Sequence, residues 1–117
     1  MVRRPREVLE PVRRGDVWCV ALHPTRGAEI QKTRPAVVLT ADALNRARRT
    51  VVVVPLSTGP APHPPIVVAV PSGGAKTVAV CDQLRAVDRT RLSTRTGQLS
   101  GTDLQKIEAA VRQVLRL

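Results

Sequence analysis

The stretch Thr33-Arg34-Pro35-Ala36-Val37-Val38-Leu39-Thr40 decides how the rest of the chain is interpreted. Its apolar, β-branched second half is typical of a buried strand. Pro35 has no N–H to donate, so it fits only at the first residue of a strand or on an edge, and it keeps Arg34 extended. The stretch therefore predicts a strand over 35–40 with a cation at its mouth, either as an ordinary surface charge or as part of a site that binds an anion.

The segment 50–58, TVVVVPLST, has the strongest β preference in the chain. Its four consecutive valines predict a strand that is buried on both faces and lies at the centre of a sheet. Pro55, near its end, predicts a bulge or a departure from the ladder. Such a departure would leave Ser57 and Thr58 outside the core, so two hydroxyl groups are expected at the exit of the central strand.

Shorter stretches complete a mainly β fold. The segment Thr102-Asp103-Leu104-Gln105 has capping-box spacing and opens a C-terminal helix with one apolar stripe. A further turn of helix is expected near 41–46, and the remaining strands are expected over 16–22, 66–70, 77–81 with a continuation through 82–87, and 94–98. These elements predict a small curled antiparallel sheet or barrel, with the helix covering a face or an end.

The length of 117 residues fits one domain, and the charge is strongly positive. Nineteen Lys and Arg against nine Asp and Glu give a formal net charge of +10, which makes a polyanion, and first of all a nucleic acid, the expected partner. Trp18 is the only aromatic residue, so base stacking on aromatic side chains cannot be the main binding mode. The planar groups of arginine, hydroxyls and backbone groups must then recognise the nucleic acid.

Several classes of protein are disfavoured by the pattern. Residues 1–12 are expected to be a basic, flexible extension and 13–117 a single domain, with no signal peptide and no membrane span, which places the protein in the cytoplasm. Cys19 and Cys81 are isolated in apolar surroundings and are expected to be reduced core residues. Without metal-ligand spacing, neither a metal nor another cofactor is expected.

Five fragments, taken in order, resemble the MazF/PemK family of toxin endoribonucleases over residues 13–117. They are Arg14-Gly15-Asp16-Val17-Trp18, Gly27-Ala28-Glu29, Arg34-Pro35-Ala36-Val37-Val38-Leu39, Val53-Val54-Pro55-Leu56-Ser57-Thr58, and Asp82-Gln83 ahead of the closing helix. The resemblance implies an SH3-like barrel that forms a homodimer and cleaves single-stranded RNA at short motifs without metal. It also implies inhibition by an acidic, MazE-like antitoxin.

The resemblance assigns the catalytic groups. Arg34 matches the catalytic arginine, and Ser57 stands at the place of the catalytic threonine, with Thr58 next to it. Serine keeps the hydroxyl but lacks the methyl group that stiffens χ1, so both hydroxyls remain candidates. Attack of a ribose 2′-OH on a phosphodiester builds negative charge on the non-bridging oxygens, and a planar guanidinium is well suited to stabilise it.

The general base is a separate question, because arginine stays protonated at ordinary pH. Glu29 matches a segment of the family and could accept the 2′-OH proton, although pairing with Lys32 is its alternative role. His63 and His23 are the other groups that titrate near neutral pH.

RNA contacts are expected from residues around this centre. Asp82 and Gln83 match a family segment that contacts bases, and carboxylates and amides can read the edges of unstacked bases. The other residues assigned to RNA binding are Thr25, Lys32, Pro35, Arg85 and His63. A track for phosphates is expected from Arg46, Arg48, Arg49, Arg85, Arg89, Arg91 and Arg95.

Two other functions are compatible with such a fold. Gyrase-poisoning toxins share it and act by binding protein, and a basic SH3-like module could bind nucleic acid without chemistry. Arg34 and the hydroxyls at the strand exit favour the nuclease.

Overall fold

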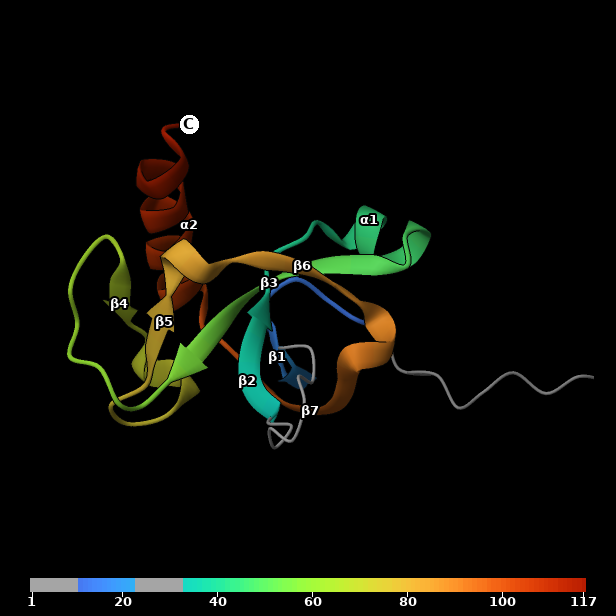
Figure 1. Cartoon of the computed structure of the whole chain (residues 1–117), viewed down its shortest axis with the longest axis horizontal. Coiled ribbons are helices and arrows are strands. Elements are labelled where there is room, and N and C mark those ends of the chain that lie inside the picture. The colour runs from blue at the N-terminus through green and yellow to red at the C-terminus, as the bar shows by residue number, and fades with distance from the viewer. Residues whose placement is uncertain (1–10, 23–32) are drawn as a thin grey trace, which may run out of the picture.

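The computed structural model describes residues 11–22 and 33–117, and its seven strands form one curved antiparallel sheet (Figure 1). The strand order is β4-β5-β3-β2-β1-β7, with β6 also paired to β3. The strands are β1 (Asp16–Ala21), β2 (Thr33–Val38), β3 (Thr50–Ser57), β4 (Val67–Ala69), β5 (Val78–Val80), β6 (Arg85–Asp88) and β7 (Leu92–Gln98). Within the described residues β4 and β7 do not pair, so the barrel is open, and the predicted mainly β, barrel-like fold is confirmed.

In the described part of the chain, two α-helices and three 3-10 turns connect and cover the sheet. Helix α2 (Gly101–Leu115) stands beside β4, whereas α1 (Asp42–Ala47) lies at the end of β3 where that strand begins (Figure 1). The 3-10 turns are η1 (Pro71–Gly73), η2 (Cys81–Gln83) and η3 (Arg89–Arg91). No helix in the described part of the chain combines the length and apolar character needed to cross a bilayer.

Strand β3 is the centre of the sheet, as its valines predict. Along one edge it pairs with β2, and along the other it pairs first with β6 and then with β5. Val51 and Val53 belong to one buried cluster and Val54 and Leu56 to another, so both faces of β3 are covered. The prediction of a strand buried on both faces is confirmed.

Pro55 lies inside β3, at the point where the partner strand changes. The amide of Leu39 donates to the carbonyl of Val52 at 2.9 Å. The backbone N–H and C=O groups of the even-numbered residues of β3 therefore point toward β2, and those of the odd-numbered residues point toward β6 and β5. Pairing with β6 ends at Val53, and pairing with β5 begins at Leu56. The missing N–H of Pro55 therefore falls in the gap between two partners, and the strand continues to Ser57 instead of leaving the ladder.

Strand β2 begins at Thr33, two residues earlier than predicted, and contains Pro35. The amide of Gly15 donates to the carbonyl of Val38 at 2.8 Å. The backbone N–H and C=O groups of the even-numbered residues of β2 therefore point toward β1, whereas the backbone of Pro35 points its hydrogen-bonding side toward β3. The ladder between β2 and β3 stops at Ala36, one residue before the proline. Pro35 is tolerated because it lies where this edge of β2 has become free of backbone pairing.

Two apolar clusters lie on opposite faces of the sheet. The first includes Val37, Val54 and Leu56 and is covered by Ile107 and Ala110 of α2. The second is built around Trp18. Its other members are Val12, Val20, Leu22, Ala36, Val38, Val51, Val53, Val87 and Leu92.

Two expectations about element boundaries are wrong. The strand that ends at Val80 does not continue through 82–87, because Cys81 turns into the first apolar cluster and η2 separates β5 from β6. Helix α2 begins at Gly101, and its N-cap is Ser100 instead of Thr102.

The cap of α2 ties the helix to the turn between β4 and β5. Ser100 Oγ accepts from the amide of Asp103 at 3.1 Å, and the amide of Ser100 donates to Ser72 Oγ at 2.9 Å. The buried carboxylate of Asp103 accepts from both the amide and the hydroxyl of Ser72. Burial alone would raise the pKa of Asp103, but the bonds from Ser72, with Lys106 nearby, hold it below its usual value.

We predict that Asp103→Asn lowers the free energy of unfolding by about 1–3 kcal/mol at pH 7, because a charged acceptor is lost from a buried network. Since the pKa of Asp103 is lowered in the folded state, its contribution is complete above the unfolded pKa of about 3.9 and is lost as the pH falls through the lower folded value. Urea unfolding at several pH values should therefore show the gap between the two proteins closing in acid. The exposed Asp82→Asn variant is the control, and a gap that does not depend on pH would contradict the assignment.

Candidate active site

A pocket of about 250 Å³ opens where β2 and β3 part. Strand β2 contributes its first half, β3 its last residues, and the turn before β5 the opposite wall. The lining residues are Arg34, Pro35, Leu56, Ser57, Thr58, Gly73 and Thr77. The structure thus brings together the arginine, the proline and both hydroxyl residues selected from the sequence.

The register of the sheet explains why Arg34 and Ser57 meet. Ala36 pairs with Pro55, and the same antiparallel register continued by two residues in each strand sets Arg34 opposite Ser57. Residues directly opposite each other project to the same face of a sheet. Because Pro35 has no N–H to donate to β3, β2 and β3 are not joined by backbone hydrogen bonds at this point, and the pocket lies in the opening between them.

The hydroxyl of Ser57 is held by its own loop. The amide of Gly59 donates to Ser57 Oγ at 3.3 Å, so this oxygen is already an acceptor and its proton remains available for donation. The side chain is half-buried, whereas Thr58 is exposed. Of the two hydroxyls, only that of Ser57 accepts such a hydrogen bond within the described residues.

Residues of the turn before β5, which the sequence did not single out, form the opposite wall. Thr77 is only 7% exposed, and a Cβ at Gly73 would lie 3.0 Å from Leu99 Cδ2 and 3.4 Å from Thr77 Cγ2. Gly74 has φ of 132°, where a side chain is strained. The two glycines let this wall approach the strand ends.

Arg34 is the only ionisable residue among those that line this pocket. Its guanidinium is exposed, and the other polar side chains of the lining are the hydroxyls of Ser57, Thr58 and Thr77. A permanent cation with neutral hydroxyl donors suits a tetrahedral oxyanion such as a phosphate. The part of the pocket that the structure describes therefore has the composition of a phosphate site, and its residues include no carboxylate or imidazole that could accept a proton.

The other residues selected from the sequence lie elsewhere. Glu29, Thr25 and Lys32 fall outside the described residues, as does His23. His63 is exposed in the connection between β3 and β4. The remaining ones line neither this pocket nor the one described below: Asp82 and Gln83 in η2, and Arg85 in β6, which donates to the carbonyl of Leu22.

Cys81, next to Asp82, is a buried thiol in the first apolar cluster. Burial, with a smaller contribution from the charge of Asp82, raises its pKa from 9.0 to about 11. Both cysteines are free, and Cys81 is a core residue as predicted. The prediction of a core position is wrong for Cys19, which is partly exposed and belongs to neither apolar cluster.

We predict that Cys81 reacts with iodoacetamide at pH 8 about 100-fold more slowly than the same cysteine in urea, because its thiolate fraction falls tenfold with each unit of raised pKa. Peptide mass spectrometry over a time course would give the rates of Cys81 and Cys19 separately. Equal rates in the folded and unfolded protein would contradict a buried, neutral thiol.

The chain belongs to the family described as PemK-like, MazF-like toxins of type II toxin-antitoxin systems, which matches residues 13–115. It is 35% identical over 107 residues to endoribonuclease PemK of Escherichia coli, covering 87% of this chain and 80% of that one. It is 30% identical over 115 residues to endoribonuclease MazF9 of Mycobacterium tuberculosis, covering 91% and 98% of the two chains.

Solved structures agree with the fold. A mycobacterial endoribonuclease in complex with its cognate antitoxin superposes with a TM-score of 0.73 at 24% identity, over 93% of this chain and 97% of that one. The resemblance drawn from the five sequence fragments is thereby confirmed at the level of the family.

Proposed function

We propose that this chain is an endoribonuclease toxin that cleaves single-stranded RNA at short sequence motifs. The observation that carries the proposal is the meeting of Arg34 and Ser57 in one pocket at the open ends of β2 and β3. Membership of the toxin family and the activity named for its relatives in Escherichia coli and Mycobacterium tuberculosis add support.

In the proposed reaction the ribose 2′-oxygen attacks the adjacent phosphorus while the bond from phosphorus to the 5′-oxygen breaks. A 2′,3′-cyclic phosphate and a 5′-OH end result. Arg34 binds the non-bridging oxygens and is worth most in the transition state, where their charge is greatest. Ser57 donates its free proton to the same phosphate, and no metal is required because the guanidinium supplies the charge.

The proton of the 2′-OH must go to a group outside the described pocket lining. Glu29 is the proposed base, since it belongs to the segment that precedes β2 and a carboxylate has the free lone pair that arginine lacks. The leaving 5′-oxygen takes its proton from solvent. His63 is the alternative base; its exposed position in the connection between β3 and β4 does not place it in this lining.

The proposed partners follow from the family and the charge. An acidic, MazE-like antitoxin would neutralise the chain, as the mycobacterial complex suggests, and its affinity should fall with salt. A homodimer, testable by light scattering, would extend the RNA path over two copies. The proposed compartment is the cytoplasm, where messenger RNA is accessible.

We predict that Arg34→Ala lowers kcat/KM on RNA by about 10²–10³, the usual loss of one preorganised donor. Arg34→Lys should recover little of it, because an ammonium lacks the planar fork. Gel assays with sequencing of the 5′-OH ends, in EDTA, would measure both. EDTA should not change the rate of the wild-type protein.

Arg46→Ala is the matched control. It removes one exposed arginine from α1, at the opposite end of β3, and so lowers the net charge equally. An equal loss in the Arg34 and Arg46 variants would reduce Arg34 to a general electrostatic role. A wild-type protein that leaves RNA intact but inhibits DNA supercoiling would point to the gyrase-poisoning alternative.

For the hydroxyl pair, we predict that Ser57→Ala costs about 10- to 100-fold in kcat/KM, as expected for a hydrogen bond to a charged group. Thr58→Ala should cost less, because Thr58 is exposed and Ser57 is oriented by the amide of Gly59. Ser57→Thr should retain activity. The reverse order of the two alanine variants would make Thr58 the working donor.

A further inference from the structure

A second pocket, of about 440 Å³, adjoins the candidate active site. It lies between the connection that follows β3, the strand β4 and the start of β5. Its lining residues are Thr58, Gly59, Pro60, Ala61, Pro62, Ala69, Pro71, Lys76, Thr77 and Val78, and we call it the proline pocket. Thr58 and Thr77 line both pockets, so whatever fills one lies next to whatever fills the other.

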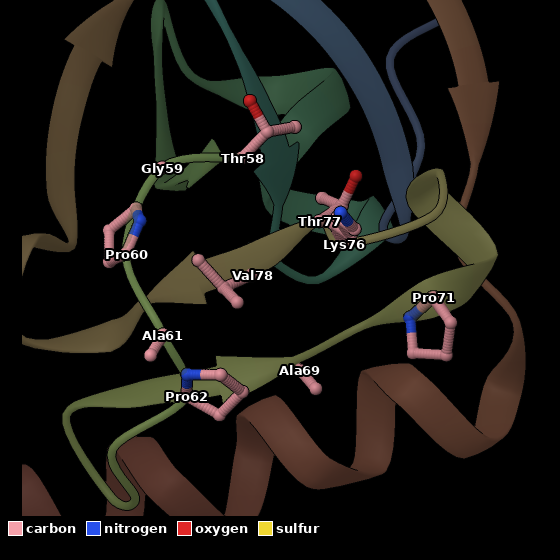
Figure 2. A pocket seen from close by; sticks show the side chains of 10 residues that line it. All are labelled: Thr58, Gly59, Pro60, Ala61, Pro62, Ala69, Pro71, Lys76, Thr77 and Val78. Carbon is pink, nitrogen blue, oxygen red and sulfur yellow. The ribbon is translucent and has the colours of Figure 1, made fainter.

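The proline pocket is divided into a polar end and an apolar end. Figure 2 shows Thr58 and Thr77 at one end and Pro62 and Ala69 at the other. Val78 lies between them (Figure 2). A fitting ligand has a flat or compact apolar body and hydrogen-bonding groups on the edge that faces the active site.

A nucleobase has these properties, and its position would be fixed by the phosphate. In single-stranded RNA each phosphate is joined to a ribose and base on either side, so a phosphate held by Arg34 brings a base to the neighbouring pocket. The volume lies within the range of small-molecule sites. The threonine hydroxyls can donate to or accept from a base edge, as recognition of unstacked RNA requires.

The apolar walls of the proline pocket also compensate for the shortage of aromatic residues in this chain. Trp18, the only Phe, Tyr or Trp residue, is 2% exposed, and His63 is not among the residues that line the proline pocket, so no aromatic ring in that lining can stack on a base. The faces of a base must then be covered by aliphatic surface. Pro60, Pro62 and Pro71, which are all exposed, offer such a surface beside the phosphate site.

The walls are held in shape before any ligand arrives. The prolines restrict the connection after β3, which lowers the entropy lost on binding. Lys76 has φ of 66°, a left-handed conformation that is uncommon for residues other than glycine. Its exposed ammonium belongs to the pocket lining and can reach a further phosphate of the same strand.

We infer that the proline pocket binds the nucleobase adjoining the phosphate held at Arg34 and determines the base preference at that position. The inference rests on the proposed function for the location of the phosphate. It makes the connection 58–62 a specificity element in addition to a link between strands.

Ala61→Leu and Ala69→Leu are the test variants, because each adds volume inside the proline pocket without removing a polar group. Ala61 lies in an exposed connection, so its substitution should leave the fold intact. Ala43→Leu is the matched control, since it is the same change at an exposed position of α1, at the other end of β3.

Each protein is given a long mixed RNA, and the 5′-OH ends are sequenced. In the Ala61→Leu and Ala69→Leu variants, the ratio of purines to pyrimidines at one position next to the cleaved bond should fall about tenfold, because a purine needs more of the volume that the leucine side chain occupies. An abasic nucleotide at that position should raise KM for the wild type and have little further effect on Ala61→Leu. The control should match the wild type in both measurements.

Binding is measured separately, by sequencing the fraction of a randomised 2′-O-methyl RNA pool that each protein captures, since such RNA has no 2′-OH nucleophile. If the wild type captures a preferred base that Ala61→Leu does not, the inference stands even where cleavage fails. Base profiles that are the same in the wild type and both filled variants would overturn it. Loss of antitoxin binding with an unchanged base profile would also overturn it and assign the pocket to a peptide.

Discussion

The double pairing of β3 is the constraint on which the rest of the structure depends. One edge of this strand is shared between β6 and β5, and the change of partner falls at Pro55, the residue that has no N–H to pair. On the other edge, pairing with β2 stops one residue short of Pro35. Two prolines thus end or interrupt ladders at the same level of the sheet, which leaves Arg34 and Ser57 on neighbouring strands that do not pair with each other at this point.

The helix is linked to this opening through the turn between β4 and β5. The carboxylate of Asp103 accepts from Ser72, and the residue after Ser72 is Gly73, which lines the candidate active site. A Cβ at Gly73 would press on Leu99, directly before the N-cap of α2. Capping of the helix and placement of the pocket wall are therefore one set of contacts, and a change at either end is expected to be felt at the other.

Most of the fold could be predicted because its signals are local. The valines of β3 and the periodicity of α2 need no partner to be recognised. The N-cap could not be assigned in this way, because Ser100 and Thr102 each stand at the start of a segment with capping-box spacing. The choice between them depends on a hydrogen bond to Ser72, which is far away in sequence. Likewise Arg34 and Ser57 were found through their motifs, but Thr77 was missed, since its importance comes from the turn that carries it into the pocket.

The positive charge has two different uses. Arg85, Arg89 and Arg91 donate to backbone carbonyls of Leu22, Asn45 and Ala21, so their guanidinium groups are fixed in structural roles. A carbonyl does not neutralise a cation, and these arginines still attract a polyanion over about 8–10 Å at physiological salt. Each of them is anchored by one such bond, which limits its freedom to turn toward a phosphate. Long-range attraction thus comes from the whole surface, whereas in the proposed function the positioning of one phosphate falls to Arg34, whose pocket offers hydroxyls as its neighbours.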